Sequence, residues 1–198
     1  MKKRGLYQID KSEKIIKEFT LSVLTEDKAG LLNHITIIFN RRKLNIDSLN
    51  VSTTEVKGVS RFTIVVKTTF ESAIKVMKQI KKLVDVLGAF LYEEDQIYYQ
   101  EIALYKLSTK IFLKGEEVEN IVRSFGGKIL VIEKKHTIII KTGNKNETQK
   151  LYNELEKFGS ILEFVRSGRV AVSKSTRNTK SFLNELEKIK SNKLNIKK

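Results

Sequence analysis

The turn Asp27-Lys28-Ala29-Gly30 has the residue types with the clearest chemical use in this chain. Apolar and polar residues alternate before the turn, as in a half-buried strand. After it, apolar residues recur at the spacing of one helix face, namely Leu31, Leu32, Ile35, Ile38 and Phe39. The turn therefore leads into a helix N-terminus, whose first backbone N–H groups have no partner within the helix and can seat an anion. Gly30 has no Cβ, so a ligand could approach this backbone closely. Asp27 could accept a hydrogen bond from an ammonium group, so the turn favours a free amino acid as ligand.

A purely structural interpretation of the same turn also fits. A short acidic side chain such as Asp27 can cap a helix, and Gly30 can relieve a tight turn. Such helix-start signals are common in proteins that bind nothing at the helix end. The residues of the turn alone leave both interpretations open.

Other chemical motifs are absent from the sequence. His34 and His136 are the only histidines, no cysteine is present, and the signatures of zinc proteases, serine hydrolases, dinucleotide sites and P-loops do not occur. The carboxylates are spread over solvated helix positions. We therefore expect neither a catalytic site nor a metal site, and we assign both histidines a structural or surface role.

The net charge of +15 raises the question of a nucleic-acid partner. Residues 1–17 hold six Lys or Arg against two acidic residues, and residues 174–198 hold eight against two. The excess charge is therefore concentrated at the two ends, where a solvated basic tail is the commoner outcome. This weakens the nucleic-acid hypothesis without removing it.

Neither a secretory leader nor a membrane span is expected. No run of about 18 apolar residues is present, and the basic residues at the start are followed by mixed polar sequence. We expect a soluble cytoplasmic protein.

The elements around the turn predict a ferredoxin-like fold. The strand that contains Phe19, Leu21 and Val23 precedes the turn, and the helix follows it. The order then continues with strands at 46–54 and around 62–66, a helix at 70–80 and a strand at 84–91. This β-α-β-β-α-β order gives a four-stranded antiparallel sheet with both helices on one face.

The second half of the chain repeats this order. We expect a strand at 101–107, a helix that ends at Gly126-Gly127, a hairpin of 129–133 and 137–141, a helix that ends at Gly159, and strands at 161–165 and 170–172. This half lacks the Asp-x-x-Gly turn, so it would have lost the ligand seat. Near the C-terminus, Phe182, Leu183, Leu186 and Ile189 have the spacing of one amphipathic helix, which would be marginal alone.

We thus predict an α+β protein with two ferredoxin-like βαββαβ domains. The predicted divisions are a leader at 1–17, a first domain at 18–93, a second domain at 94–174 and a basic tail at 175–198.

Several stretches together resemble one known family. They are LSVLTEDKAGLL at 21–32, IFNRRKLNIDSL at 38–49, VSRFTIVV at 59–66, KKLVDV at 81–86, QEIALYK at 100–106, FGGKI at 125–129 and RSGRVA at 166–171. This ordered set, spread over about four-fifths of the chain, resembles the small regulatory subunit of acetolactate synthase (acetohydroxyacid synthase). The first domain of that subunit is an ACT domain.

The resemblance implies a noncatalytic homodimer that binds the catalytic large subunit, raises its activity and confers feedback inhibition by a branched-chain amino acid, with valine favoured. Thiamine diphosphate, FAD and Mg²⁺ belong to the catalytic partner in that family, so no cofactor is expected in this chain. The effector would bind between two ACT domains. Its implied contacts are Asp27, Lys28, Ala29, Gly30, Leu31 and Leu32 of one chain, with Asn45 and Ile46 of the facing chain.

Two positions depart from the family pattern. Asp27 stands where the family usually has Asn, which adds a negative charge near the ligand carboxylate, and Lys43 stands where a Gly is usual.

Two alternatives to the regulatory subunit remain, a stand-alone ACT-type amino-acid sensor for another partner and an RNA-binding module. RNA-binding sheets stack bases on aromatic residues of their central strands, and the third strand offers only Phe62, within a core-like alternation.

Overall fold

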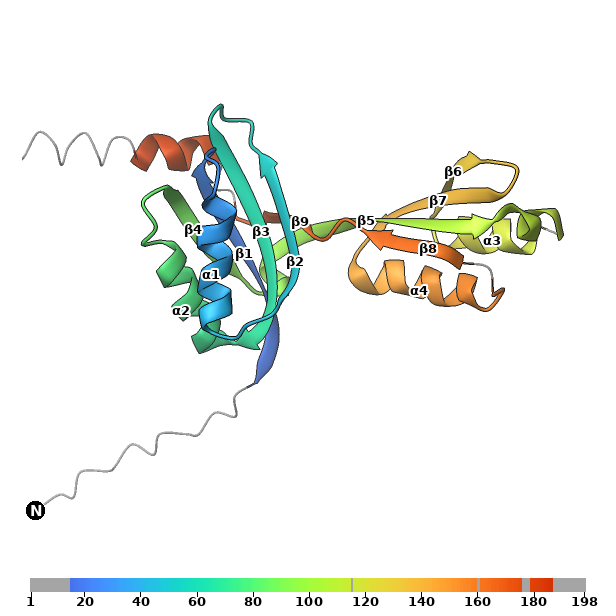
Figure 1. Cartoon of the computed structure of the whole chain (residues 1–198), viewed down its shortest axis with the longest axis horizontal. Coiled ribbons are helices and arrows are strands. Elements are labelled where there is room, and N and C mark those ends of the chain that lie inside the picture. Colours follow the sequence, from blue (N-terminus) through green and yellow to red (C-terminus); the bar gives the residue numbers. More distant parts are fainter. Residues whose placement is uncertain (1–14, 115, 160, 176–178, 187–198) are drawn as a thin grey trace, which may run out of the picture.

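The computed structural model describes residues 15–114, 116–159, 161–175 and 179–186. The chain forms two lobes, each an antiparallel sheet with helices on one face (Figure 1). Most of the predicted leader, residues 1–14, lies outside the described residues. No helix in the described part of the chain is long and apolar enough to cross a membrane.

The first lobe has the predicted β-α-β-β-α-β order and the strand order β2-β3-β1-β4. Both helices cover one face of this sheet (Figure 1), which confirms the ferredoxin-like arrangement. Its elements are β1 (Ile16–Glu26), α1 (Leu31–Arg41), β2 (Ile46–Thr53), β3 (Val59–Thr69), α2 (Phe70–Ile80) and β4 (Val86–Tyr92).

The core of this lobe follows the two periodicities of the sequence. Alternate residues of β1, Phe19, Leu21 and Val23, are completely buried against the helices. On α1, Ile35 and Phe39 are also fully buried. Leu32, which we placed on this face, is 45% exposed, because it is rotated by about 100° around the helix from Leu31.

The boundaries of two strands differ from the prediction. Ile16 and Lys17, which we expected in the leader, already belong to β1 and pair with β3. At the other edge, β4 begins at Val86, and Val84 is exposed in the turn after α2. At the predicted boundary between the two domains, after residue 93, the chain forms a short 3₁₀ helix, η1 (Glu94–Gln96).

The second lobe repeats the topology, with strand order β6-β7-β5-β8 and β9 paired with β5. The repeat is therefore confirmed, including the extra strand. The element that the sequence did not reveal is the 3₁₀ helix η2. The elements are β5 (Ile97–Ser108), η2 (Thr109–Lys114), α3 (Glu117–Ser124), β6 (Lys128–Ile132), β7 (His136–Gly143), α4 (Lys145–Glu156), β8 (Ile161–Arg166) and β9 (Val170–Ser173).

A buried arginine joins the two lobes. Arg169, just before β9, is only 2% exposed. Its Nη1 donates a hydrogen bond of 2.7 Å to Oγ1 of Thr20, its Nη2 bonds the carboxylate of Glu18, and its guanidinium lies 3.7 Å above the ring of Tyr99. Burial, followed by the hydrogen bond to Glu94, raises the pKa of Tyr99 to about 12, so the ring stays neutral beneath the cation.

The described C-terminal residues pack on the helix-free face of the first sheet. Residues 179–186 are helical, and Leu183 is 9% exposed, in a cluster with Leu24 and Val59. The ring of Phe182 meets Phe90 edge-on at 5.1 Å. The predicted amphipathic helix thus exists over these residues and packs on the sheet, while Ile189 lies outside the described residues.

The Arg169 contact gives a first prediction. Replacing Arg169 with Leu should lower the free energy of unfolding by about 3 kcal/mol, because it leaves the partly buried Glu18 carboxylate without its cation. Arg169→Lys should recover only part of this loss, because an ammonium cannot stack on Tyr99 and bond two acceptors as a planar guanidinium does. Urea unfolding of the three proteins measures the difference. If the free energy of unfolding of Arg169→Leu equals that of the parent, the Arg169 contact does not stabilise the packing of the two lobes.

Lys43 gives a second prediction, since it is the one non-glycine residue in the described chain with a positive φ, 54°. A left-handed conformation costs a residue with a Cβ roughly 1–2 kcal/mol. Lys43→Gly should therefore stabilise the protein by about 1 kcal/mol, or about 2–4 °C in Tm. Lys43→Ala is the matched control, since it keeps the Cβ and should give no gain in thermal unfolding. If the two substitutions change Tm equally, the positive φ at residue 43 does not strain the backbone.

Candidate functional site

The predicted turn has an unusual backbone at Gly30. This residue immediately precedes α1 with φ 84° and ψ −12°, in the left-handed region. A Cβ at Gly30 would meet no atom within 4 Å. The space beside this backbone is therefore open, and glycine is required by conformation rather than by a close neighbour.

Several backbone donors at the start of α1 are available. The N–H groups of Asn33 and His34 both bond the carbonyl of Gly30, at 3.1 and 3.4 Å. The N–H groups of residues 29–32 have no hydrogen-bond acceptor within the described part of the chain. These donors lie at the positive end of the helix dipole, which is the arrangement that binds anions.

Asp27 does not cap the helix, so that part of the structural interpretation is wrong. Helix α1 has no side-chain cap, and Oδ1 of Asp27 instead accepts a hydrogen bond of 3.0 Å from the hydroxyl of Ser60 on β3. The backbone N–H of Asp27 bonds the carbonyl of Gly58 at 2.9 Å. The carboxylate is thus held in place at the surface, beside the free N–H groups.

Lys28 contributes to the turn through its ion pairs. Its Nζ lies 2.8 Å from Oδ1 of Asp85 and 2.6 Å from Oε2 of Glu26. The hydrogen bond to Asp85, and then that to Glu26, raises the pKa of Lys28. Because two carboxylates already surround this ammonium, an anion at the turn would be bound by backbone N–H groups rather than by Lys28.

The remaining predicted site residues separate into two groups. Leu31 is buried in the core, and Leu32 is exposed beside the turn. Asn45 is exposed and Ile46 half-buried, at the start of β2. The 11 residues of α1 separate these two from the turn, a length of about 16 Å at 1.5 Å per residue. The fold therefore does not bring Asn45 to the turn within one chain.

Sequence reasoning missed Ser60 and Asp85, which hold the turn in shape. Ser60 lies opposite Thr25 in the pairing of β1 with β3, and Asp85 lies just before β4. Both lie in stretches that carry the family resemblance, at 59–66 and 81–86, but their contacts with the turn could not be predicted, because only the strand register brings them there.

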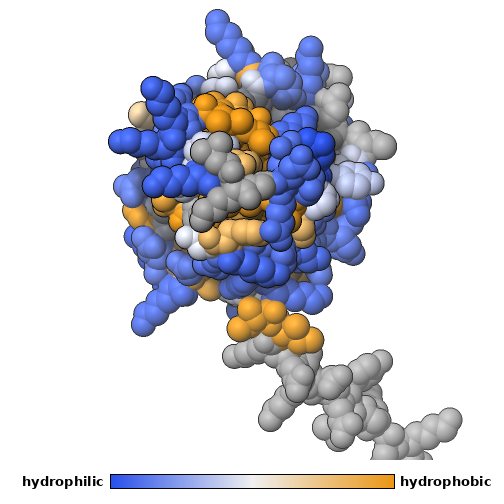
Figure 2. Space-filling model, turned by 90° about the vertical axis from the view of Figure 1, so that its right-hand side faces the viewer, coloured by the Kyte–Doolittle hydropathy of each residue, from blue (hydrophilic) through white to orange (hydrophobic). Residues whose placement is uncertain are grey.

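An apolar surface also lies on the second lobe, on the sheet face away from α3 and α4. Figure 2 views this lobe from its end and shows hydrophobic side chains exposed among hydrophilic ones. Exposed apolar faces of this kind mark contact surfaces. The exposed residues on the strands of that face include Ile102, Leu104, Val131 and Val165, each 38–50% exposed.

Comparison with known proteins gives consistent matches to both halves. A family model described as "AHAS small subunit-like ACT domain" matches residues 21–88, and one described as "Small subunit of acetolactate synthase" matches residues 100–175. The acetolactate synthase small subunit of Mycolicibacterium smegmatis is 37% identical over 158 residues, which cover 80% of this chain and 92% of that protein. The Bacillus subtilis small subunit is 31% identical over 163 residues, 82% of this chain and 92% of that protein.

A solved structure matches both lobes together. The crystal structure of the acetolactate synthase small subunit from Thermotoga maritima superposes with a TM-score of 0.74 and 29% identity. The superposition covers 82% of this chain and all of that one.

Proposed function

Because the chain belongs to the family of acetolactate synthase small subunits, we propose that it is the noncatalytic regulatory subunit of such an enzyme. It binds the catalytic large subunit, raises its activity and makes it sensitive to a branched-chain amino acid, with valine favoured. In this proposal, thiamine diphosphate, FAD and Mg²⁺ are bound by the catalytic partner in the cytoplasm.

The observation that carries the proposal is the pairing of opposite groups at the turn. The N–H groups of residues 29–32 suit a carboxylate, and the Asp27 carboxylate beside them suits an ammonium. A free α-amino acid carries both groups on one carbon. The exposed Leu32 side chain adds an apolar surface next to them, as a branched aliphatic side chain requires.

The turn is an open surface in a single chain, which supports a dimeric site. Strand β2 is the edge of its sheet, and Val51 on its helix side is 45% exposed. The end of β2 lies near the turn, because the hairpin that follows β2 bonds Asp27 through Gly58. Antiparallel pairing of two β2 edges would thus bring Asn45 of the second copy to the turn. In that arrangement Asn45 and Ile46 complete the site.

We therefore predict a dimer through the β2 edge. At tens of micromolar, sedimentation should give twice the chain mass, and Val51→Asp should raise the dissociation constant at least about tenfold, because it buries a charge in an apolar contact. Val84→Asp is the matched control, since Val84 is 94% exposed in the same lobe and should leave the dimer intact. A monomer with and without valine would contradict this prediction.

Reconstitution with the acetolactate synthase catalytic subunit of the same cell tests the function directly. The small subunit should co-purify with it and raise its rate, and valine should then inhibit the complex. If the small subunit stimulates the enzyme but no branched-chain amino acid inhibits the complex, the proposal of a branched-chain effector is wrong. Failure to bind the catalytic subunit would favour the stand-alone sensor.

Gly30→Asp should separate inhibition from stimulation. The substitution places a negative charge where the effector carboxylate binds. Loss of hydrogen bonds to a charged group costs about 1.5–3 kcal/mol, so the inhibition constant should rise about 10- to 100-fold. Stimulation of the catalytic subunit should remain, because no atom lies within 4 Å of the new Cβ and Asp tolerates a left-handed backbone better than most residues.

Gly159→Asp is the matched control for this experiment. Gly159 also has a positive φ, 61°, and open space around its missing Cβ, but it lies after α4 in the second lobe. It should reproduce any cost of backbone strain and charge while leaving inhibition unchanged. Normal inhibition of a well-folded Gly30→Asp complex would place the effector elsewhere.

Asp27→Asn should weaken effector binding. An asparagine Oδ1 can still accept from Ser60, so the turn keeps its shape while the negative charge that suits the effector ammonium is removed. A hydrogen bond to a charged acceptor is worth about 1 kcal/mol more than one to a neutral acceptor, so the affinity should fall about five- to tenfold. Isothermal titration with valine measures the change. Tighter binding by Asp27→Asn would mean instead that Asp27 repels the effector carboxylate and does not bind the ammonium.

A further inference from the structure

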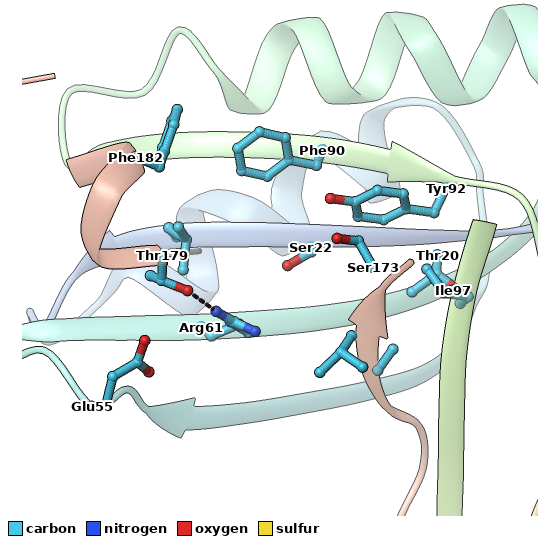
Figure 3. Close-up of a pocket in the computed structure, with 13 residues that line it drawn as sticks. Thr20, Ser22, Glu55, Arg61, Phe90, Tyr92, Ile97, Ser173, Thr179 and Phe182 are labelled. Atoms are coloured by element: carbon cyan, nitrogen blue, oxygen red, sulfur yellow. Dashed lines mark hydrogen bonds between the residues drawn. The ribbon is translucent and has the colours of Figure 1, made fainter. Parts of the chain in front are cut away.

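A pocket lies on the helix-free face of the first sheet, away from the turn. It has a volume of about 360 Å³ and lies between the sheet, β9 and the described C-terminal residues (Figure 3). Hydroxyl groups of Thr20, Ser22 and Ser173 line it, with the aromatic rings of Phe90 and Tyr92. None of residues 27–32, 45 and 46 lines this pocket, so it is separate from the proposed effector seat. Its volume falls within the range of small-molecule sites.

One wall of the pocket comes from the C-terminal segment, beyond the family match that ends at residue 175. Thr179 and Phe182 line it from residues 179–186. Phe182 fits closely over Gly88, since a Cβ at Gly88 would lie 2.7 Å from the Phe182 ring. The Phe182 ring can therefore take this position because residue 88 of β4 is a glycine and has no Cβ.

Arg61 is the positive charge of the pocket. Its Nη2 donates a hydrogen bond of 2.6 Å to Oγ1 of Thr179, as Figure 3 shows. No carboxylate of the described residues lies within ion-pair distance of Arg61, and its Nε, shielded from solvent, has no hydrogen-bond partner among them. A guanidinium has five N–H donors and pairs best with a carboxylate or phosphate. Arg61 thus retains donors for an anion.

The other charge at the pocket limits the kind of anion. Glu55 lines it from the turn after β2 and is exposed. A carboxylate so placed repels a dianion such as a phosphate more strongly than a monoanion. The rings of Phe90, Tyr92 and Phe182 offer an apolar surface for the rest of the ligand.

We propose that this pocket binds a small monocarboxylate with an apolar tail. The carboxylate pairs with Arg61, and the tail packs against Phe90 and Phe182. This site is independent of the amino-acid effector, because it needs no second copy and lies on the opposite face of the sheet.

Isothermal titration of the full chain with 3-phenylpropionate, 4-methylpentanoate and octanoate tests the proposal. At least one acid should bind saturably, and its matched neutral alcohol should bind at least about tenfold more weakly, since a hydrogen bond to a charged group is worth about 1.5–3 kcal/mol. Absence of binding by all three acids, or equal binding of acid and alcohol, would overturn it.

Substitutions then locate the bound acid. Arg61→Gln should weaken binding at least about tenfold, whereas Lys67→Gln, the same charge change on the same strand but outside the pocket, should not. Gly30→Asp should leave binding unchanged, so failure of the effector proposal and of this one can be told apart. Circular dichroism of each variant checks folding. Binding that survives Arg61→Gln in a folded protein would overturn the proposal.

Gly88→Ala tests the C-terminal wall without touching a charged group. The new Cβ must push the Phe182 ring away, so acid affinity should fall about tenfold, as for the loss of a buried aromatic contact. The double variant Gly88→Ala, Phe182→Leu should bind about as weakly as Gly88→Ala alone, because both changes remove the same ring contact. Unchanged affinity in Gly88→Ala would show that residues 179–186 do not form part of the site.

Discussion

Each lobe of this protein obeys the same constraint, that a ferredoxin-like unit covers only one face of its sheet. In the first lobe, α1 and α2 bury alternate residues of β1 and β3, and the other face still has Leu24, Phe90 and Tyr92. Residues 179–186 and β9 pack over this second face. In the second lobe, the corresponding face leaves Ile102, Leu104 and Val165 exposed. Burial of an apolar face by another segment or another chain lowers the cost of hydrating it. The two lobes thus differ in that residues 179–186 pack on this face only in the first lobe.

The sequence was sufficient for the architecture because local periodicity carries it. Alternation in β1 and the 3.6-residue repeat in α1 predicted the core residues Phe19, Leu21 and Phe39, and the second β-α-β-β-α-β set followed in the same way. The errors lay at the ends of elements. Val84 was predicted in a strand but is exposed before β4 begins, and Leu32 was predicted on the buried face of α1 but is exposed, unlike its apolar neighbour Leu31. The 3₁₀ helix η2 has no apolar period of its own, so periodicity could not reveal it.

The groups that shape the candidate site were less accessible to sequence reasoning. The turn and its glycine followed from residue types alone, and the structure places Gly30 in the left-handed conformation that glycine adopts readily. The partners of Asp27 and Lys28 could not be found in this way, because Ser60 and Asp85 reach the turn only through the strand register. Arg169 reaches Thr20 across 149 positions of sequence. Contacts of this kind depend on tertiary structure, and single-sequence patterns do not encode them.

Strand β1 gives a physical connection between these features. Glu18 and Thr20 near its start bond Arg169 of the second lobe, and its other end leads directly into the turn at Asp27. Between these ends, β1 is hydrogen-bonded to β3 on one side and to β4 on the other. A strand held on both sides moves with its sheet rather than bending alone. Strand β1 is therefore a continuous hydrogen-bonded connection between the turn and the contact of Arg169 with the second lobe.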